Sequence, residues 1–230
     1  MKSKKKKIVI LLFGPPGAGK DTQAERLAKR FNLFHFITSS FIQQIIFNPR
    51  LQKNPIIRKQ LKLYQSGIWC GPAWVLTLVK KKVKEISKRG RGMVFTASPR
   101  TLFEARGLIP FLESLYGQEN IYVLKIVLKD KSAIFRIIHR RFCEKCKHTI
   151  IYSPKNKSLK KCPECGGKII SRKIDTAAIT RKRLKEYKKR TMPVLRFLKK
   201  RHYKIIEIGG EPLPDAVTKQ IFEKLEKSGF

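Results

Sequence analysis

Short runs of apolar residues recur along the chain and predict the strands of a buried sheet. Residues 8–13 are an unbroken apolar run, β-branched at its start, as expected of a strand covered on both faces. Similar runs alternate with helical patterns, an order that favours a parallel sheet in an α/β fold. The predicted strands are residues 8–13, 33–37, 92–96, 121–128 and 204–208.

Apolar residues at helical spacing predict amphipathic helices between these strands, at residues 22–31, 41–47, 56–64, 73–86 and 215–225. The hydroxyl cluster Thr38-Ser39-Ser40 is suited to cap the helix that follows it. A further helix carries Leu184, Leu195 and Leu198, and Pro193 must kink or restart it.

The charge of the chain is its unusual compositional feature, because 53 basic residues face 16 acidic ones and the net charge is +37. Such a field attracts nucleic acid, anionic membranes or polyanionic small molecules. Lysine is nevertheless spread along the whole chain, which also fits a lysine-biased composition.

The lysine-rich residues 1–7 precede an apolar run that ends after six residues, at Gly14. That run is too short for a secretory core or a membrane span. We therefore expect a lysine leader in front of the first strand, no membrane association and a cytoplasmic protein. The apolar content of 42% is sufficient for a packed core.

Residues 14–20 read G-x-x-x-x-G-K between the first predicted strand and a helix. Strand, glycine-rich turn and helix start form the context of a phosphate-binding loop. The glycines let the backbone bend around an anion, and the N–H groups of the next helix face it together with Lys20. Asp21 stands where such loops carry Ser or Thr, and the hydroxyl comes one place later, at Thr22. A glycine-rich turn without a ligand is the alternative.

The string GPPGAGKDTQAERLAKRF resembles the adenylate kinase family, whose loop reads G-x-P-G-x-G-K-G-T. The resemblance extends from Ile8 to Leu225. It implies reversible transfer of the γ-phosphoryl group from magnesium-ATP to a nucleoside monophosphate. ATP would bind at Gly17, Ala18, Gly19, Lys20, Asp21, Thr22, Arg136, Arg140 and Glu211.

The motifs that bind the phosphoryl donor in this family are well matched by the sequence. Residues 136–141 match the family's R-I-x-x-R-R, and two arginines four apart would share a helix face. Arg172 and Asp175 match its R-x-D-D, and Arg183 falls on a further family arginine. The resemblance implies that the catalytic cations are Lys20, Arg100, Arg140, Arg172 and Arg183.

The acceptor half departs from the family pattern. Thr38 matches T-G-D-x-x-R, whereas Gln43 replaces the arginine that grips the acceptor phosphate. Thr96 replaces the aspartate that holds the water shell of magnesium, which puts metal handling in doubt. The implied acceptor-binding residues are Thr38, Gln43, Trp69, Cys70, Arg100, Glu104, Arg172 and Arg183. Alternatively, Trp69 only packs in the protein interior, and Cys70 is a small buried hydrophobic residue.

Glu104 stands where the family carries a glutamine that reads adenine. An ionised carboxylate offers only acceptors and would bridge the N1–H and N2–H donors of guanine. This chemistry favours GMP, while the whole-chain resemblance favours AMP, which we expect to be the acceptor. Alternatively, the side chain of Glu104 points away from the base.

Cysteines form the pattern C-x2-C-x15-C-x2-C, the spacing of a tetrahedral structural zinc site. The expected Zn²⁺ ligands are Cys143, Cys146, Cys162 and Cys165. Disulfides are the alternative, but cysteine pairs of a cytosolic chain indicate metal. The segment between them is polar, so metal would replace a missing core. Some adenylate kinases carry a zinc knuckle in the lid at this position.

We thus expect one kinase domain, residues 1–230, with a five-stranded parallel sheet of the P-loop type flanked by helices. An acceptor arm (38–70) and a zinc lid (139–175) are inserted in it. We expect a monomer with ATP and a nucleoside monophosphate as its partners. One alternative is a catalytically weak nucleotide-binding pseudo-kinase. The other is a zinc-knuckle nucleic-acid-binding protein, disfavoured because no clustered aromatic platform is visible in the sequence.

Overall fold

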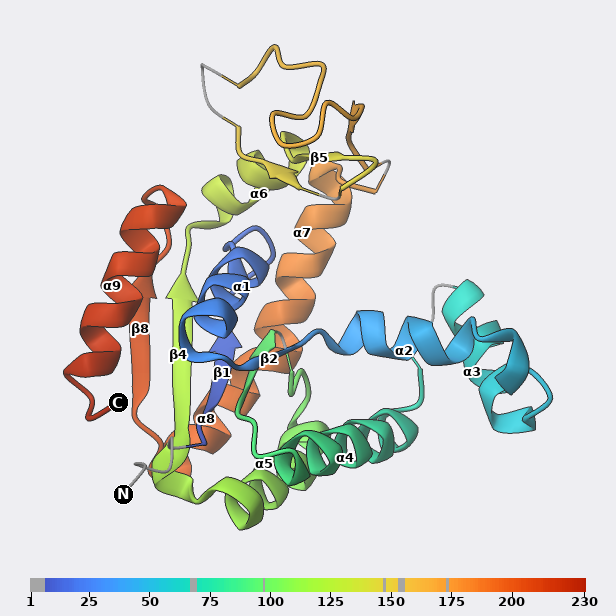
Figure 1. The fold of residues 1–230 in the computed structure, drawn as a ribbon, viewed down its shortest axis with the longest axis vertical. Helices are drawn as coiled ribbons and strands as arrows, with labels where there is room; N and C mark the ends of the chain where they lie inside the picture. Colours follow the sequence, from blue (N-terminus) through green and yellow to red (C-terminus); the bar gives the residue numbers. More distant parts are fainter. Residues whose placement is uncertain (1–6, 67–69, 97, 147, 153–155, 173) are drawn as a thin grey trace.

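The structure is a computed structural model that describes residues 7–66, 70–96, 98–146, 148–152, 156–172 and 174–230. Within these residues, five parallel strands form a sheet in the order β2-β3-β1-β4-β8 (Figure 1). Their bounds are β1 Val9–Phe13, β2 Phe34–Phe36, β3 Met93–Thr96, β4 Ile121–Val127 and β8 Ile205–Gly209. The predicted fold class and its five strands are confirmed.

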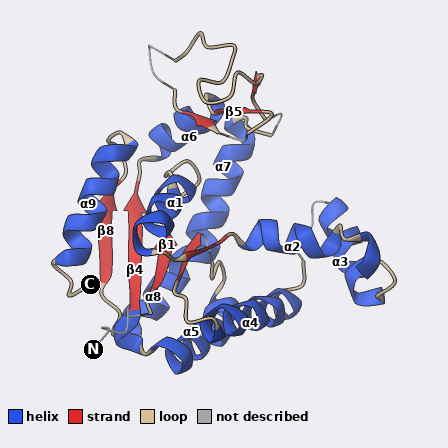
Figure 2. Cartoon of the chain, in the orientation of Figure 1, coloured by secondary structure: helices blue, strands red, loops and turns tan. Residues whose placement is uncertain are grey.

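Helices cover both faces of this sheet (Figure 2). The helices of the described residues are α1 Lys20–Phe31, α2 Thr38–Ile46, α3 Pro55–Gln65, α4 Pro72–Lys88, α5 Leu102–Tyr116, α6 Asp130–Ile138, α7 Ala177–Glu186, α8 Met192–Lys200 and α9 Pro214–Glu226. Short helical turns are η1 Pro49–Leu51, η2 Gln118–Asn120 and the π-helical η3 Tyr187–Thr191. Pro193 lies in the first turn of α8, where its ring restarts the helix, as predicted.

The central strand β1 explains why the core has two halves. Leu11 and Phe13 pack with residues of α4, α5 and α8, whereas Ile10 and Leu12 pack with α1 and α9. Successive side chains of a strand point to opposite faces, so one unbroken apolar run serves both halves. Leu12 pairs with Thr96 of β3, which brings the ends of both strands to the same edge of the sheet.

Two segments project from the sheet. The helices α2 and α3 extend to one side of it (Figure 1). A second segment beyond α6 and α7 contains the small antiparallel sheet β6-β5-β7, with bounds Thr149–Ile150, Arg141–Cys143 and Ile169–Ile170. No helix among the described residues has both the length and the apolar character needed to cross a membrane.

The start of α2 corrects one prediction. Thr38 is the first residue of the helix and Ile37 is its N-cap, with no side-chain cap. The predicted capping by the hydroxyl cluster is therefore wrong. The chain passes from β2 into α2 through a single residue, and the buried Oγ1 atom of Thr38 has no hydrogen-bond partner in the part of the chain that the structure describes.

Candidate active site

The predicted phosphate loop connects β1 to α1. Gly17 and Gly19 have φ angles of 80° and 77°, which favour glycine. A Cβ atom on Gly17 would lie 2.8 Å from the carbonyl oxygen of Ala133, so that position also requires the absence of a side chain. Lys20 donates from Nζ to the carbonyl oxygens of Gly14 and Pro15, at 2.8 Å each. Its ammonium group is thus held against the loop.

Burial lowers the pKa of Lys20 from 10.5 to about 8. Asp21 opposes this shift, whereas the neighbouring cations Arg100, Arg183 and Arg140 add to it. Like charges at short range cost free energy, and an anion bound among them would remove that cost. The pKa of Lys20 therefore indicates an anion-binding site.

Two arginines belong to the same group of cations. Burial lowers the pKa of Arg100, and the nearby charge of Arg183 lowers it further. Burial, Arg140 and Arg172 lower the pKa of Arg183. Cations that come from the end of β3, the loop after α6, and α7 therefore gather beside the phosphate loop. Arg172 lies at the edge of this group, with its guanidinium 5.2 Å from the ring centroid of Phe142.

Arg140 does not share a helix face with Arg136, because α6 ends at Ile138. The prediction that both side chains project from one face of a helix is wrong. Arg140 instead pairs with Asp175, from Nε to Oδ2 at 2.9 Å and from Nη2 to Oδ1 at 2.8 Å. This contact joins residues that are 35 positions apart, so no local pattern could reveal it.

Arg136 and Glu211, both predicted to bind ATP, lie next to each other. Arg136 donates from Nη2 to the carbonyl oxygen of Glu211 at 2.7 Å. The carboxylate of Glu211 accepts from the backbone N–H of Lys129 at 2.9 Å. That bond, with the hydroxyl of Ser132, lowers the pKa of Glu211. The turn after β8 is thereby tied to the start of α6, at the side of the sheet where the loop lies.

On the acceptor side, Thr38 is 8% exposed, and its buried hydroxyl has no hydrogen-bond partner among the described residues. Gln43 donates from Nε2 to the hydroxyl of Tyr64 at 2.7 Å, which links α2 to α3. Cys70 is half-buried, with Sγ 3.8 Å from the carbonyl oxygen of Gln60, and burial raises its pKa. Trp69 lies outside the described residues.

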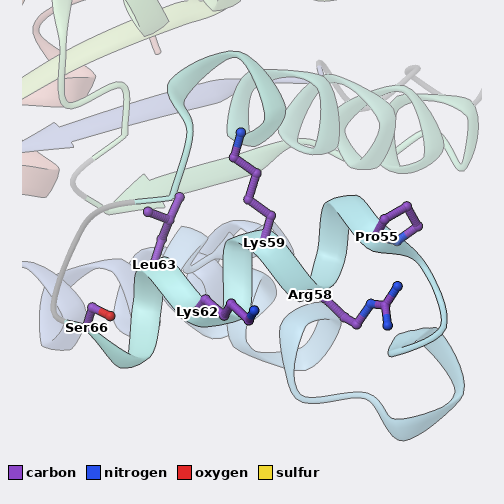
Figure 3. Close-up of a pocket in the computed structure, with 6 residues that line it drawn as sticks. All are labelled: Pro55, Arg58, Lys59, Lys62, Leu63 and Ser66. Carbon is purple, nitrogen blue, oxygen red and sulfur yellow. The ribbon is translucent and has the colours of Figure 1, made fainter.

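A basic groove of about 470 Å³ runs along α3 and is lined by Pro55, Arg58, Lys59, Lys62, Leu63 and Ser66 (Figure 3). Figure 3 shows Lys59 and Leu63 extending to the same side of the helix. Lys62 lies two residues before Tyr64, which places it about 200° around the helix from Tyr64. Its charge therefore lies on a different face of α3 from the Gln43–Tyr64 contact.

The carboxylate of Glu104 is engaged near the end of β3. Its Oε2 atom accepts from the backbone N–H of Arg100 at 2.7 Å. Thr101 is the N-cap of α5 and accepts from the backbone N–H of Glu104 at 3.2 Å. The two residues together satisfy donors at the start of α5, an arrangement close to a capping box. Thr96, at the end of β3, is neutral and 4% exposed.

The four predicted cysteines come together. Their Sγ atoms all lie within 4.8 Å of one another, as four ligands of a tetrahedral Zn²⁺ require. The backbone N–H of Cys146 approaches Sγ of Cys143 at 3.4 Å and is the main cause that lowers the pKa of Cys143 to about 6. A Cβ atom on Gly167 would lie 2.8 Å from Sγ of Cys143, so the glycine makes room for the sulfur cluster. The geometry and chemistry of these donors fit zinc.

A cluster of exposed aromatic side chains was not predicted. The rings of Phe135 and His139 are 4.3 Å apart, and Tyr152 lies 4.6 Å from His139 and 5.4 Å from Phe135. Phe135 is 47% exposed and Tyr152 38%. No aromatic cluster was identified from the sequence, and the structure brings these three rings together. The four-residue spacing of Phe135 and His139 was visible in the sequence, but the position of Tyr152 depends on the fold.

A phosphate loop at the edge of a parallel sheet, surrounded by arginines, defines a P-loop phosphotransferase. A sequence model of the adenylate kinase family matches residues 12–203. The adenylate kinases of Caldicellulosiruptor bescii and Petrotoga mobilis are each 32% identical to the chain, over 94% of it and over 98% and 96% of their own lengths. That of Archaeoglobus fulgidus is 28% identical over 95% of the chain and 98% of its own length.

The chain therefore belongs to the adenylate kinase family and is a nucleoside monophosphate kinase. Enzymes of this family transfer a phosphoryl group between ATP and a nucleoside monophosphate, and they generally use Mg²⁺ with ATP.

Proposed function

We propose that this enzyme catalyses ATP + AMP = 2 ADP. The observation that carries the proposal is the gathering of Lys20, Arg100, Arg140 and Arg183 beside the phosphate loop. Phosphoryl transfer needs two substrates held in line and a charge-compensating environment for the transferred group. The coverage of nearly the whole chain by relatives named adenylate kinase supports AMP as the acceptor.

Each part of the site has a proposed role. The loop residues Gly17–Thr22 hold the phosphates of ATP, and Lys20 and Arg140 neutralise charge on the group that moves. Arg100, Arg172 and Arg183 bind the phosphate of AMP and the transferred group. Thr38, at the start of the arm (residues 38–70), would bind the acceptor, which requires its buried hydroxyl to become accessible. Since α3 carries its lysines on another face, Arg100 is the cation best placed to compensate for Gln43.

Mg²⁺ bound with ATP supplies neutralisation of phosphate charge. The side chains of Asp21 and Thr22 offer oxygen donors beside the loop, which is the donor type that Mg²⁺ prefers. Zn²⁺ would be held by Cys143, Cys146, Cys162 and Cys165 in the lid, residues 139–175. With four protein ligands it has no open position, so its role would be to hold the lid together. Closure of lid and arm over the substrates would exclude water from the reaction.

A coupled assay with ATP against AMP, GMP, CMP and UMP tests this function. We expect the highest kcat/KM with AMP. A preference for another monophosphate would overturn the AMP assignment but keep the kinase. Nucleotide binding without turnover of any acceptor would favour a pseudo-kinase, the alternative suggested by Gln43 and Thr96.

The aromatic cluster favours nucleic acid as a second candidate partner, because exposed rings next to basic residues stack on unpaired bases. Filter binding of single-stranded RNA tests this candidate across a salt series. Replacing Phe135 and Tyr152 by alanine should weaken binding if the bases stack there. Binding that depends on salt but not on these rings would reflect the net charge alone.

A further inference from the structure

Three carboxylates act on the cations of the active site, and two of them are engaged. Glu104 and Asp21 influence the pKa of Arg100, and Asp175 that of Arg183. Glu104 accepts from the backbone N–H of Arg100, and Asp175 pairs with Arg140. Asp21 is exposed and makes no hydrogen bond or ion pair within the described part of the chain. It is the carboxylate left available for a ligand.

In P-loops generally, the position of Asp21 is that of a metal ligand, whereas the loop pattern of the adenylate kinase family has glycine there and its hydroxyl one place later. The side chain that follows the loop lysine is usually Ser or Thr, and its hydroxyl binds the Mg²⁺ that accompanies the nucleotide. In this chain that place holds Asp21, in the first turn of α1 and directly after Lys20. A carboxylate is a stronger ligand for Mg²⁺ than a hydroxyl, because it is charged. The nearby end of β3 offers only the neutral Thr96.

Electrostatics also favours a metal ion next to Asp21. A carboxylate that faces the β- and γ-phosphates repels them, unless a cation stands between the two anions. Asp21 lies close enough to Lys20 and to Arg100 to raise the pKa of each. Its place in the first turn of α1, directly after Lys20, puts it beside the loop in which the phosphates would lie. Without a metal this residue would weaken nucleotide binding.

We propose that Asp21 is a ligand, direct or through water, of the Mg²⁺ bound with the donor nucleotide. This inference rests on the proposed function, because it assumes that the donor phosphates occupy the loop. It means that the enzyme carries its metal-binding carboxylate on α1, at the start of the helix, rather than at the end of β3.

The test is calorimetric titration of a non-hydrolysable ATP analogue, once with Mg²⁺ and once with EDTA. The ratio of the two dissociation constants measures how strongly metal and nucleotide bind together. We expect Asp21→Asn to reduce this ratio at least about tenfold, with tighter binding in EDTA and weaker binding in Mg²⁺. Glu25→Gln is the matched control, one turn further along α1, and should leave the ratio unchanged. Electron paramagnetic resonance of Mn²⁺, with the analogue present, gives a direct view of the metal in both variants.

An unchanged ratio in Asp21→Asn, with the Mn²⁺ spectrum of the wild type, would overturn the proposal. A lower Tm with an unchanged ratio would also overturn it, because Asp21 would then only stabilise the start of α1. If the wild type fails to bind the analogue with or without metal, the proposed function fails instead.

Discussion

Arg140 and Asp175 form a doubly hydrogen-bonded ion pair that joins the two ends of residues 139–175, the segment that contains the four clustered cysteines. The side chain of Asp175 is 2% exposed and that of Arg140 is 29% exposed. Arg140 precedes β5, and Asp175 precedes α7, so the pair fixes the place where the segment leaves the core and returns to it. The same contact holds a proposed catalytic arginine in one orientation.

Loss of this pair should destabilise the protein and slow the reaction. We expect Asp175→Ala to lower the free energy of unfolding by about 3 kcal/mol, because it leaves a partly buried guanidinium unpaired. Asp130→Ala is the control, since the Asp130–Lys188 pair is exposed and should contribute less than about 1 kcal/mol. Urea unfolding of both variants measures the difference. Equal effects would mean that the Arg140–Asp175 pair has no special stabilising role.

The cysteine cluster predicts that about one equivalent of zinc is bound to each chain. The reason is that four sulfurs within 4.8 Å form a closed site in a segment with a small core. Metal analysis of tag-free protein should detect this zinc, and chelation should increase proteolysis within residues 139–175 before the core unfolds. Protein without zinc, with its cysteines oxidised, would instead support disulfides.

The pKa of Lys20, about 8, predicts a pH dependence of nucleotide affinity. Burial and neighbouring cations favour the neutral amine in the free protein, whereas bound phosphate favours the ammonium form. Raising the pH through 8 removes the proton from the free protein, and binding must then restore it. Affinity should therefore fall above pH 8, by up to about tenfold per pH unit. Lys20→Arg keeps its charge, so its affinity should not fall in this way between pH 7 and 9.5.

Charge stabilisation of the transferred group predicts large losses of turnover. Lys20→Ala and Arg100→Ala should each reduce kcat at least about a hundredfold, which corresponds to roughly 3 kcal/mol. Arg58→Ala, in the groove on α3, is a control and should retain most of the activity. Circular dichroism should show native folding in all three variants. Turnover near the wild-type value in Lys20→Ala or Arg100→Ala would contradict the catalytic assignment.

The strands and the cysteine cluster could be predicted because their signals are local. An unbroken apolar run such as residues 8–13 is typical of a strand buried on both faces, and β1 occupies Val9–Phe13. The spacing of the cysteines alone indicated that they would meet. The apolar run lies within a short stretch of the chain, and the cysteines follow a known spacing.

Apart from the capping of α2, which is a local error, the errors concern residues whose position depends on distant parts of the chain. No glycine or proline follows α6, so the sequence did not show that the helix ends at Ile138. The contact of Arg140 with Asp175 depends on the fold. The aromatic cluster likewise needs Tyr152 to return to Phe135 and His139.

Glu104 shows how one contact changes an expectation about specificity. From its chemistry alone, an ionised Glu104 would bridge the N1–H and N2–H donors of guanine. In the structure its Oε2 atom accepts from the backbone N–H of Arg100, at the start of α5. With Oε2 at this donor, the carboxylate can bridge the two guanine donors with both of its oxygens only if it turns away from the start of α5.

We therefore expect Glu104→Gln to leave the ratio of kcat/KM for AMP and GMP within about twofold of the wild type. The amide oxygen of glutamine can still accept from Arg100, so the start of α5 is preserved. Glu104→Ala removes the acceptor and should lower the free energy of unfolding by about 1 kcal/mol, as the loss of a capping side chain does. Steady-state kinetics with AMP and GMP measure the specificity, and urea unfolding measures the stability of both variants. If Glu104→Gln moves the preference strongly toward AMP while stability stays unchanged, Glu104 reads the base and its contact with Arg100 is exchanged for one with the substrate.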